Sequence, residues 1–266
     1  MSQAQDAAPA ERSRRPRRGD VATAPRTAGV WDAVQQGVQQ LRSRTGRDRL
    51  DVLDLGGGTG GLAVALAAQG HQVLVVDPSP DALAALERRA EESGVADRVR
   101  SVQADAATLA DVVGAADADL VCCHEVLEHV DDPADALAEV VRAVRPGGIV
   151  SLLVAQRSAT VVARALAGRF VEAAQALDDP SGRWGPADPL PRRFDVAALG
   201  DLVASAGLVV RHLHGVRLFS DLVPEVLLEG DDSRTALLEL ERRAGAGDSG
   251  LVALATQLHV LAERQP

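Results

Sequence analysis

Short runs of apolar residues alternate along most of the chain with longer amphipathic stretches. Runs rich in Val, Leu and Ile, typical of buried strands, lie at 51–55, 72–76, 99–103, 118–123 and 149–155. Alanine-rich stretches with helical periodicity lie between them, at 61–69, 80–93, 107–113 and 134–145. This alternation predicts an α/β fold of the Rossmann-like kind, in which helices cover both faces of a mostly parallel sheet.

The segments on either side of this region have different patterns. Apolar residues from Trp31 to Leu41 recur at helical spacing before the first strand. After the fifth strand the pattern predicts helices at 158–177, 195–206 and 233–244, and strands at 207–219 and 257–263. A Pro- and Gly-rich loop at 178–191 is long enough to act as a lid. Residues 1–25 are polar and Arg-rich, which predicts a disordered basic tail before one domain at 26–266.

The composition agrees with a folded domain. Apolar residues make up 46% of the chain and charged residues 25%, close to globular averages. The adjacent Cys122 and Cys123 have the spacing of neither a disulfide nor a metal site, which favours a reducing, cytoplasmic location. No apolar run has the length of a membrane span and no N-terminal segment has the pattern of a signal peptide, so we expect no membrane attachment.

The net charge of −10 is unevenly distributed. Residues 51–144 carry 18 acids and 5 arginines, whereas residues 145–217 carry 9 arginines and 6 acids. Because phosphate neutralisation dominates nucleic-acid affinity, the acidic first half argues against a broad nucleic-acid footprint. The basic segment permits an anionic substrate.

A glycine-rich turn at 56–61 follows the first strand, and a helix begins directly after it. Gly56, Gly57 and Gly58 let the backbone approach a ligand at the helix N-terminus. The turn satisfies both GxGxG, which suits S-adenosylmethionine, and the GxGxxG of dinucleotide sites; a purely structural turn is a third interpretation. Asp54 precedes the turn, where it would repel a pyrophosphate and attract the ammonium and sulfonium groups of S-adenosylmethionine. This favours the methyl donor.

Two further acids follow the second and third strands. Asp77 lies 19 residues beyond Gly58, where a carboxylate accepts hydrogen bonds from both ribose hydroxyls. Its alternative role is that of an acid at a helix N-terminus. Asp105 and the backbone of Ala106 suit recognition of adenine, or Asp105 caps the next helix.

These motifs occur in the order of a known family. VLDLGGGTG, VVDPSP, QADAA, DADLVCCHEVLEHVDDP and VRPGGIVSLLVA cover about 50–155 and resemble the successive motifs of class I S-adenosylmethionine-dependent methyltransferases. Beyond them, LPRRF, HGVRLFSDLV and QLHVLAER resemble the bacterial tRNA 5-carboxymethoxyuridine methyltransferase family, which methylates a carboxylate on a wobble uridine.

The resemblance carries several expectations. It implies a seven-stranded sheet of order 3-2-1-4-5-7-6, S-adenosylmethionine as cofactor and the tRNA anticodon loop as partner. It puts donor contacts on Gly56, Gly57, Asp77, Ala106, Ala107 and His124, and on Arg26, five residues before Trp31. Arg26 would bind the donor's carboxylate, or it is a solvated arginine of the tail. The chain departs from the family pattern at Gln156 and Arg157, where the family has a Tyr-Asn pair.

Arginines of the basic segment are candidates for holding the acceptor. A carboxylate is ionised at neutral pH and needs no general base, so cations that hold it are the main requirement. Arg192 and Arg217 lie in the family-like stretches LPRRF and GVRLF and are the first candidates; Arg157 and Arg193 are further ones. Each has an alternative role as a surface arginine. His124 either contacts a ligand or is a core histidine.

Glu125, Glu128 and His129 form an ExxEH motif. It resembles the metal-binding motif of catechol-type O-methyltransferases, in which a divalent metal activates a hydroxyl acceptor. The same residues suit a helix start, the interpretation we favour, so we expect no metal. The alternatives to carboxylate methylation are a small-molecule O-methyltransferase, a non-catalytic donor-binding module and an NAD-dependent oxidoreductase.

Overall fold

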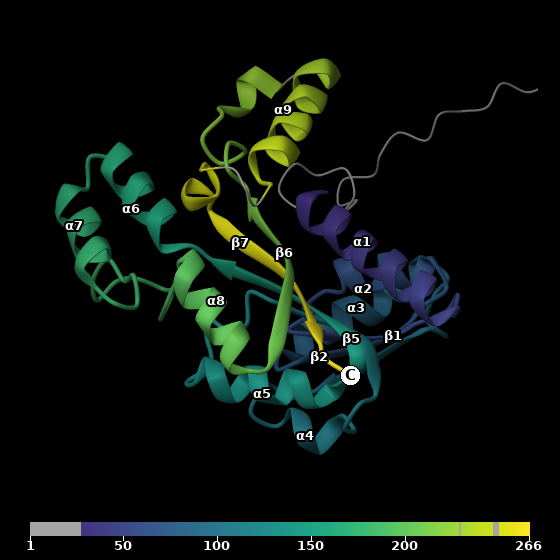
Figure 1. Ribbon diagram of the computed structural model, residues 1–266. Helices are drawn as coiled ribbons and strands as arrows, with labels where there is room; N and C mark the ends of the chain where they lie inside the picture. Colours follow the sequence, from purple (N-terminus) through teal and green to yellow (C-terminus); the bar gives the residue numbers. More distant parts are fainter. Residues whose placement is uncertain (1–27, 229, 247–249) are drawn as a thin grey trace, which may run out of the picture.

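The computed structural model describes residues 28–228, 230–246 and 250–266 (Figure 1). These residues contain one seven-stranded sheet of order β3-β2-β1-β4-β5-β7-β6. Its strands are β1 (Asp51–Leu55), β2 (Gln72–Asp77), β3 (Val99–Gln103), β4 (Ala118–His124), β5 (Val144–Ala155), β6 (Leu208–Val216) and β7 (Gln257–Arg264). Strands β1 to β5 pair in parallel, and β7 runs antiparallel to both β5 and β6. The predicted fold class and strand order are confirmed.

Helices cover both faces of the sheet. They are α1 (Ala28–Thr45), α2 (Gly61–Ala68), α3 (Pro80–Glu92), α4 (Leu109–Val112), α5 (Pro133–Ala143), α6 (Arg157–Leu166), α7 (Phe170–Asp178), α8 (Val196–Ser205) and α9 (Asp231–Ala244), with short 3₁₀ turns η1 (Glu225–Leu228) and η2 (Val252–Leu254). Apolar side chains of α1, α2 and α3 pack on one face, and those of α4, α5 and α8 on the other. Among the helices that the structure describes, none is both long and apolar enough to cross a membrane.

The chain after β5 differs from the sequence prediction. The single helix predicted at 158–177 is wrong: α6 and α7 are separate helices, which extend beyond the sheet in Figure 1. Gly168 lies between them with a φ of +72°, a left-handed conformation that ends a helix without steric cost in glycine. The strand predicted at 207–219 ends at Val216, because Arg217 has a φ of +60° and turns the chain.

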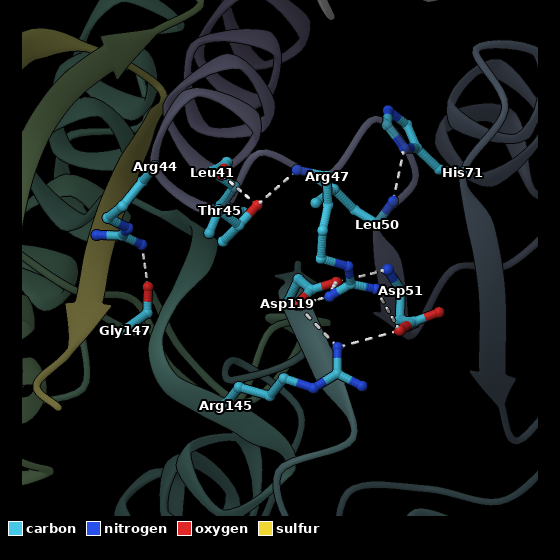
Figure 2. Close-up of polar contacts among 10 residues, drawn as sticks. All are labelled: Leu41, Arg44, Thr45, Arg47, Leu50, Asp51, His71, Asp119, Arg145 and Gly147. Atoms are coloured by element: carbon cyan, nitrogen blue, oxygen red, sulfur yellow. Dashed lines mark hydrogen bonds and ion pairs between the residues drawn. The ribbon is translucent and has the colours of Figure 1, made fainter.

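An ion cluster joins four elements at the amino-terminal edge of the sheet (Figure 2). The almost fully buried carboxylate of Asp119 forms ion pairs with Nη1 of Arg47, at 2.7 Å, and with Nη1 of Arg145, at 2.8 Å. It also accepts the backbone N–H of Asp51 at 2.8 Å. The cluster thereby connects the turn after α1 to β1, β4 and β5. It lies at the edge opposite the glycine turn, so we assign it a structural role.

Candidate active site

A cavity of about 840 Å³ lies at the carboxyl ends of β1, β2 and β4. In open α/β sheets, ligands bind at the carboxyl edge, next to the two adjacent strands from which the chain continues to opposite sides of the sheet. Here that point is between β1 and β4. Five of the residues predicted to bind the cofactor line this one cavity: Gly56, Asp77, Asp105, Ala106 and Ala107.

The glycine turn brings bare backbone to the cavity. Gly56 has a φ of +71°, and a Cβ there would overlap Cγ2 of Val126. A Cβ at Gly57 would lie 2.6 Å from Oδ2 of Asp54, closer than packed atoms approach. The turn therefore has no room for side chains at these two positions, and the N–H groups of Gly56 and Gly60 already donate to the carbonyls of Val76 and Gly57.

Asp77 holds the turn and faces the cavity. Its Oδ2 accepts the backbone N–H of Gly58 at 2.8 Å, and its Oδ1 accepts that of Ser79 at 2.9 Å. Each carboxylate oxygen keeps a second lone pair. The side chain is buried, so its orientation is fixed. The cap of α3 is Ser79, whose Oγ accepts the N–H of Ala82, so Asp77 is not the capping residue. An oriented carboxylate with free lone pairs suits a pair of ribose hydroxyls.

Asp54 lies behind the turn and not among the residues that line the cavity. Its side chain is buried, and its Oδ2 has no hydrogen-bond partner among the described residues. Burial, and then the negative charge of Asp77, raise the pKa of Asp54 to about 7. An uncompensated buried acid at this position would be stabilised in its charged form by a cationic ligand.

The cavity wall is strongly acidic. Seven carboxylates line it, those of Asp77, Asp105, Glu125, Asp131, Asp132, Asp135 and Glu139. The described residues contribute no Arg to this wall. A pyrophosphate would meet negative charge on every side, whereas a sulfonium and an ammonium would be attracted. The residues present therefore fit S-adenosylmethionine and disfavour a dinucleotide.

Asp105 lines the cavity and forms local hydrogen bonds, but the N-cap residue of α4 is Thr108. Its Oδ1 accepts the N–H of Thr108 at 3.0 Å and the hydroxyl of Thr108 at 2.9 Å. These hydrogen bonds lower the pKa of the exposed Asp105. The carboxylate thus shapes the turn before α4, while Asp105 and its neighbours Ala106 and Ala107 also line the cavity.

His124 does not line the cavity, although it ends β4 beside the turn. Its Nε2 lies 2.7 Å from Oγ of Ser151 on β5. Burial lowers the pKa of His124 to about 4, so the ring is neutral at physiological pH. The next two residues, Glu125 and Val126, line the cavity.

The structure does not bring the four candidate arginines together. Arg192 does not line the acidic cavity, but its Nη2 donates at 2.9 Å to the carbonyl of Asp131, which does. Arg217 pairs with Asp221 at 2.7 Å and lines a separate cavity of about 200 Å³ between α1, β6 and α9. Arg193 forms a buried ion pair with Asp188 inside the 178–191 loop.

The other arginines singled out from the sequence are Arg157, the fourth candidate for the acceptor, and Arg26, the candidate for the donor. Arg157 approaches Asp195 at 3.7 Å, at the start of α8. Arg26 and the predicted tail at 1–25 lie outside the described residues.

The acids of the ExxEH motif have protein partners. Oε1 of the buried Glu128 accepts the N–H of Ala155 at 2.6 Å, and Glu125 accepts a hydrogen bond from the side chain of Gln257. Oε2 of Glu128 has no partner among the described residues, and burial raises the pKa of Glu128 to about 7. Within the described part of the chain, no three His, Cys, Asp or Glu side chains form a group that would hold a metal ion.

Sequence reasoning missed the part of the cavity that α5 contributes. Asp132 caps α5 through the N–H of Ala134 at 2.7 Å, and Asp135 and Glu139 follow on the cavity side. The signal was present in the sequence, because acids at i and i+4 share one helix face and this helix begins at the carboxyl edge of the sheet.

Comparisons with known proteins agree with this geometry. Residues 53–152 match a methyltransferase domain family. The tRNA 5-carboxymethoxyuridine methyltransferase of Escherichia coli (strain K12) is 30% identical over 90% of this chain and 88% of its own length. A ubiquinone biosynthesis O-methyltransferase of Thiobacillus denitrificans is 33% identical over 73% of this chain and 78% of its own.

Solved structures share the fold at lower identity. Magnesium protoporphyrin IX methyltransferase from Synechocystis PCC 6803, with bound SAH, has a TM-score of 0.58 and 15% identity, covering 91% of this chain and 86% of its own. A putative S-adenosylmethionine-dependent methyltransferase from Listeria monocytogenes also has a TM-score of 0.58, with 16% identity over 90% of this chain and 98% of its own.

Proposed function

The chain belongs to the class I S-adenosylmethionine-dependent methyltransferases, with S-adenosylmethionine as its cofactor, and we propose that it methylates a carboxylate, that of 5-carboxymethoxyuridine in tRNA. The choice of this acceptor rests on one observation. The similarity to the tRNA methyltransferase of E. coli extends over 90% of the chain, whereas the similarity to the ubiquinone O-methyltransferase of T. denitrificans extends over 73%. The longer match includes segments after β5, which hold the candidate arginines.

The donor site would work through residues of the first half. S-adenosylmethionine supplies an electrophilic methyl group on a sulfonium. We assign the ribose hydroxyls to Asp77 and the adenine to Asp105, Ala106 and Ala107, all of which line the acidic cavity. The backbone of Gly56, Gly57 and Gly58 would hold the methionine part, and the charge of Asp54 would attract the sulfonium.

The chemical step needs positioning more than acid or base catalysis. S-adenosylmethionine would supply its methyl group to an oxygen of the acceptor carboxylate, and its sulfur would take the electron pair of the broken carbon–sulfur bond and become a neutral thioether. No proton is transferred, because the acceptor is already ionised at neutral pH. The protein's task is to hold both reactants at a productive distance and to exclude water.

Arg192 is the best supported candidate for holding the acceptor. Arg192 does not line the cavity, but its Nη2 donates to the carbonyl of Asp131, which does, and its buried Nη1 has no partner among the described residues. A guanidinium nitrogen without a partner is suited to bind a carboxylate if the neighbouring chain moves to admit it. Arg217 remains a second candidate, although it is already paired with Asp221.

The nucleosides of tRNA test this proposal. Mass spectrometry of tRNA from cells with and without the gene should show loss of the methyl ester and accumulation of the free 5-carboxymethoxyuridine when the gene is deleted. An unchanged nucleoside profile would contradict the tRNA assignment and leave the methyltransferase itself in place.

A small-molecule O-methyltransferase is the second candidate. The ubiquinone O-methyltransferase of T. denitrificans supports it, at 33% identity over 73% of the chain. A hydroxyl acceptor must lose a proton, so this candidate predicts a rate that rises with pH as the acceptor ionises. A carboxylate acceptor predicts no such rise from its own ionisation above pH 6.

A further inference from the structure

Glu125 follows β4 directly and lines the acidic cavity next to the glycine turn. Both of its neighbours in the chain approach Gly56. The carbonyl of His124 is 3.8 Å from the position that a Cβ on Gly56 would occupy, and Cγ2 of Val126 would overlap that Cβ. Glu125 itself is exposed. An accessible acid is therefore held beside the first glycine of the turn.

The order of the strands indicates where each part of the donor lies. Strands β3, β2, β1 and β4 are consecutive in the sheet, and the adenine and the ribose are assigned to residues that follow β3 and β2. The rest of the donor then continues across the end of β1 toward β4. Its methionine part carries an α-ammonium group, for which a carboxylate is a strong partner. Of the acids at the ends of these two strands, Glu125 lines the cavity and Asp54 does not.

The backbone of Glu125 has a conformation that is uncommon for residues other than glycine. Its φ is +56°, in the left-handed region, where a Cβ is strained. The N–H of Glu125 donates to the carbonyl of Leu153 on β5 at 2.8 Å, which holds the chain in this conformation. Glycine would adopt the same φ without strain. The chain thus has a carboxylate where the backbone favours glycine, and strained residues of this kind concentrate at ligand sites.

Gln257 restricts the direction of the Glu125 side chain. Its side-chain N–H donates to Oε1 of Glu125. Gln257 is buried at the start of β7, where it is paired with Ala155 on β5 and with Val216 on β6. This one hydrogen bond leaves most of the lone pairs of the carboxylate able to accept others. An acid that is oriented before the ligand arrives binds it at a lower cost in side-chain entropy.

We propose that Glu125 binds the α-ammonium group of the donor's methionine part, and that Gln257 is a positioning residue that holds the Glu125 carboxylate for this contact. The ammonium is present in both S-adenosylmethionine and S-adenosylhomocysteine, whereas the sulfonium assigned to Asp54 is present only in the first. This inference extends the donor site and rests on the cofactor alone. It is independent of the acceptor in the proposed function.

Calorimetry with two ligands tests the contact. They are S-adenosylhomocysteine and its deaminated analogue, which lacks the α-amino group and keeps the adenosine, the sulfur and the carboxylate. Glu125→Gln keeps the length of the side chain and removes its charge. We expect it to weaken the binding of S-adenosylhomocysteine about tenfold and to leave that of the analogue within about threefold of wild type. Equal losses for the two ligands, or no loss for S-adenosylhomocysteine, would overturn the assignment.

Asp135→Asn is the matched control. It removes the same charge from the wall of the same cavity, but Asp135 lies in the first turn of α5 and not at the end of β4. We expect both affinities to change by the same factor, of less than about threefold. If Asp135→Asn reduces the preference for S-adenosylhomocysteine over the analogue as much as Glu125→Gln does, the overall charge of the cavity attracts the ammonium and the assignment to Glu125 is wrong.

Glu125→Gly separates binding from folding. Glycine removes the strain of the left-handed conformation, so the midpoint of urea unfolding should not fall. The preference for S-adenosylhomocysteine over the analogue should fall as it does in Glu125→Gln. A glycine variant that keeps the wild-type preference would contradict the proposal.

A double substitution tests the positioning role of Gln257. Gln257→Leu removes the N–H that holds Glu125 and keeps a side chain of similar size. Alone, it should reduce the preference for S-adenosylhomocysteine about threefold or more. Combined with Glu125→Gln, it should cause no further reduction, because Gln257 acts through Glu125. Additive reductions would show that Gln257 acts independently, and the positioning role would be wrong.

Discussion

The carboxylate of Asp77 accepts the backbone N–H of Gly58 at 2.8 Å, so the residue that ends β2 fixes the turn that ends β1. The same carboxylate faces the cavity, and each of its oxygens keeps a lone pair that can accept another hydrogen bond. One side chain therefore shapes the backbone that approaches the donor and presents acceptor atoms to it. An acid therefore suits the end of β2, because Asp has two oxygens that accept hydrogen bonds, whereas Asn has only one.

We predict that Asp77→Ala weakens the binding of S-adenosylhomocysteine at least tenfold. The substitution removes hydrogen bonds to a charged acceptor, worth about 1.5–3 kcal/mol each, and loosens the turn. Isothermal titration calorimetry measures the effect. Asp81→Ala is the control, since Asp81 is an exposed acid in the first turn of α3 that does not line the cavity. Equal affinities in the two variants would contradict the role assigned to Asp77.

The raised pKa of Asp54 predicts that donor binding depends on pH. Its pKa in the protein without ligand is about 7, so the carboxyl is largely neutral at pH 6 and largely ionised at pH 8. Because the ionised form attracts a sulfonium, the affinity for S-adenosylmethionine should rise between pH 6 and pH 8. The rise should be smaller for S-adenosylhomocysteine, whose sulfur is neutral, and Asp54→Asn should remove the difference. Parallel pH profiles for both ligands in the wild-type protein would rule this out.

Glu128 predicts a pH dependence of stability. Its folded pKa of about 7 exceeds the usual 4.5, so the folded state binds more protons than the unfolded state between these values. Its contribution is complete below pH 4.5 and is lost as the pH rises through 7. Glu128→Gln should therefore be more stable relative to wild type at pH 8 than at pH 5, by about 1–3 kcal/mol in urea unfolding. The exposed Glu91→Gln should show no such change with pH.

The adjacent Arg192 and Arg193 should have different effects. Arg192→Ala removes the guanidinium that bonds to the carbonyl of Asp131 beside the cavity, so we expect a higher KM for the acceptor with unchanged affinity for S-adenosylhomocysteine. Arg193→Ala leaves the buried carboxylate of Asp188 unpaired and should lower the free energy of unfolding by about 3 kcal/mol or more. Steady-state kinetics and urea unfolding of both variants separate the two roles. The assignment of Arg192 fails if its variant keeps the wild-type KM.

The features that the sequence predicted correctly are local in the chain. The alternation of apolar runs and Ala-rich stretches predicts the first five strands, and the turn from Gly56 together with Asp77 marks the cavity, because each of these signals lies within one βα unit. The break between α6 and α7 was missed, since Gly168 interrupts a pattern that is helical on both sides.

Features that depend on packing between distant segments could not be predicted in this way. Arg192 and Arg217 are 25 residues apart, and only the tertiary structure shows that one bonds to Asp131 beside the acidic cavity and the other lines a second cavity. The contact between His124 and His259 through Ser151 joins three strands whose pairing the chain order does not reveal. The role of Arg193 likewise depends on Asp188, in a loop with no periodic pattern.

Product analysis with purified components shows whether this methyltransferase esterifies a carboxylate of tRNA, as proposed. The protein would be incubated with S-adenosylmethionine and with tRNA that carries unmethylated 5-carboxymethoxyuridine, and the nucleosides analysed by mass spectrometry. We predict a nucleoside heavier by one CH₂ group that returns to the starting mass after mild alkaline hydrolysis, as an ester does. A methylated product that resists alkali, or methyl transfer only to hydroxyl-bearing small molecules, would contradict the claim.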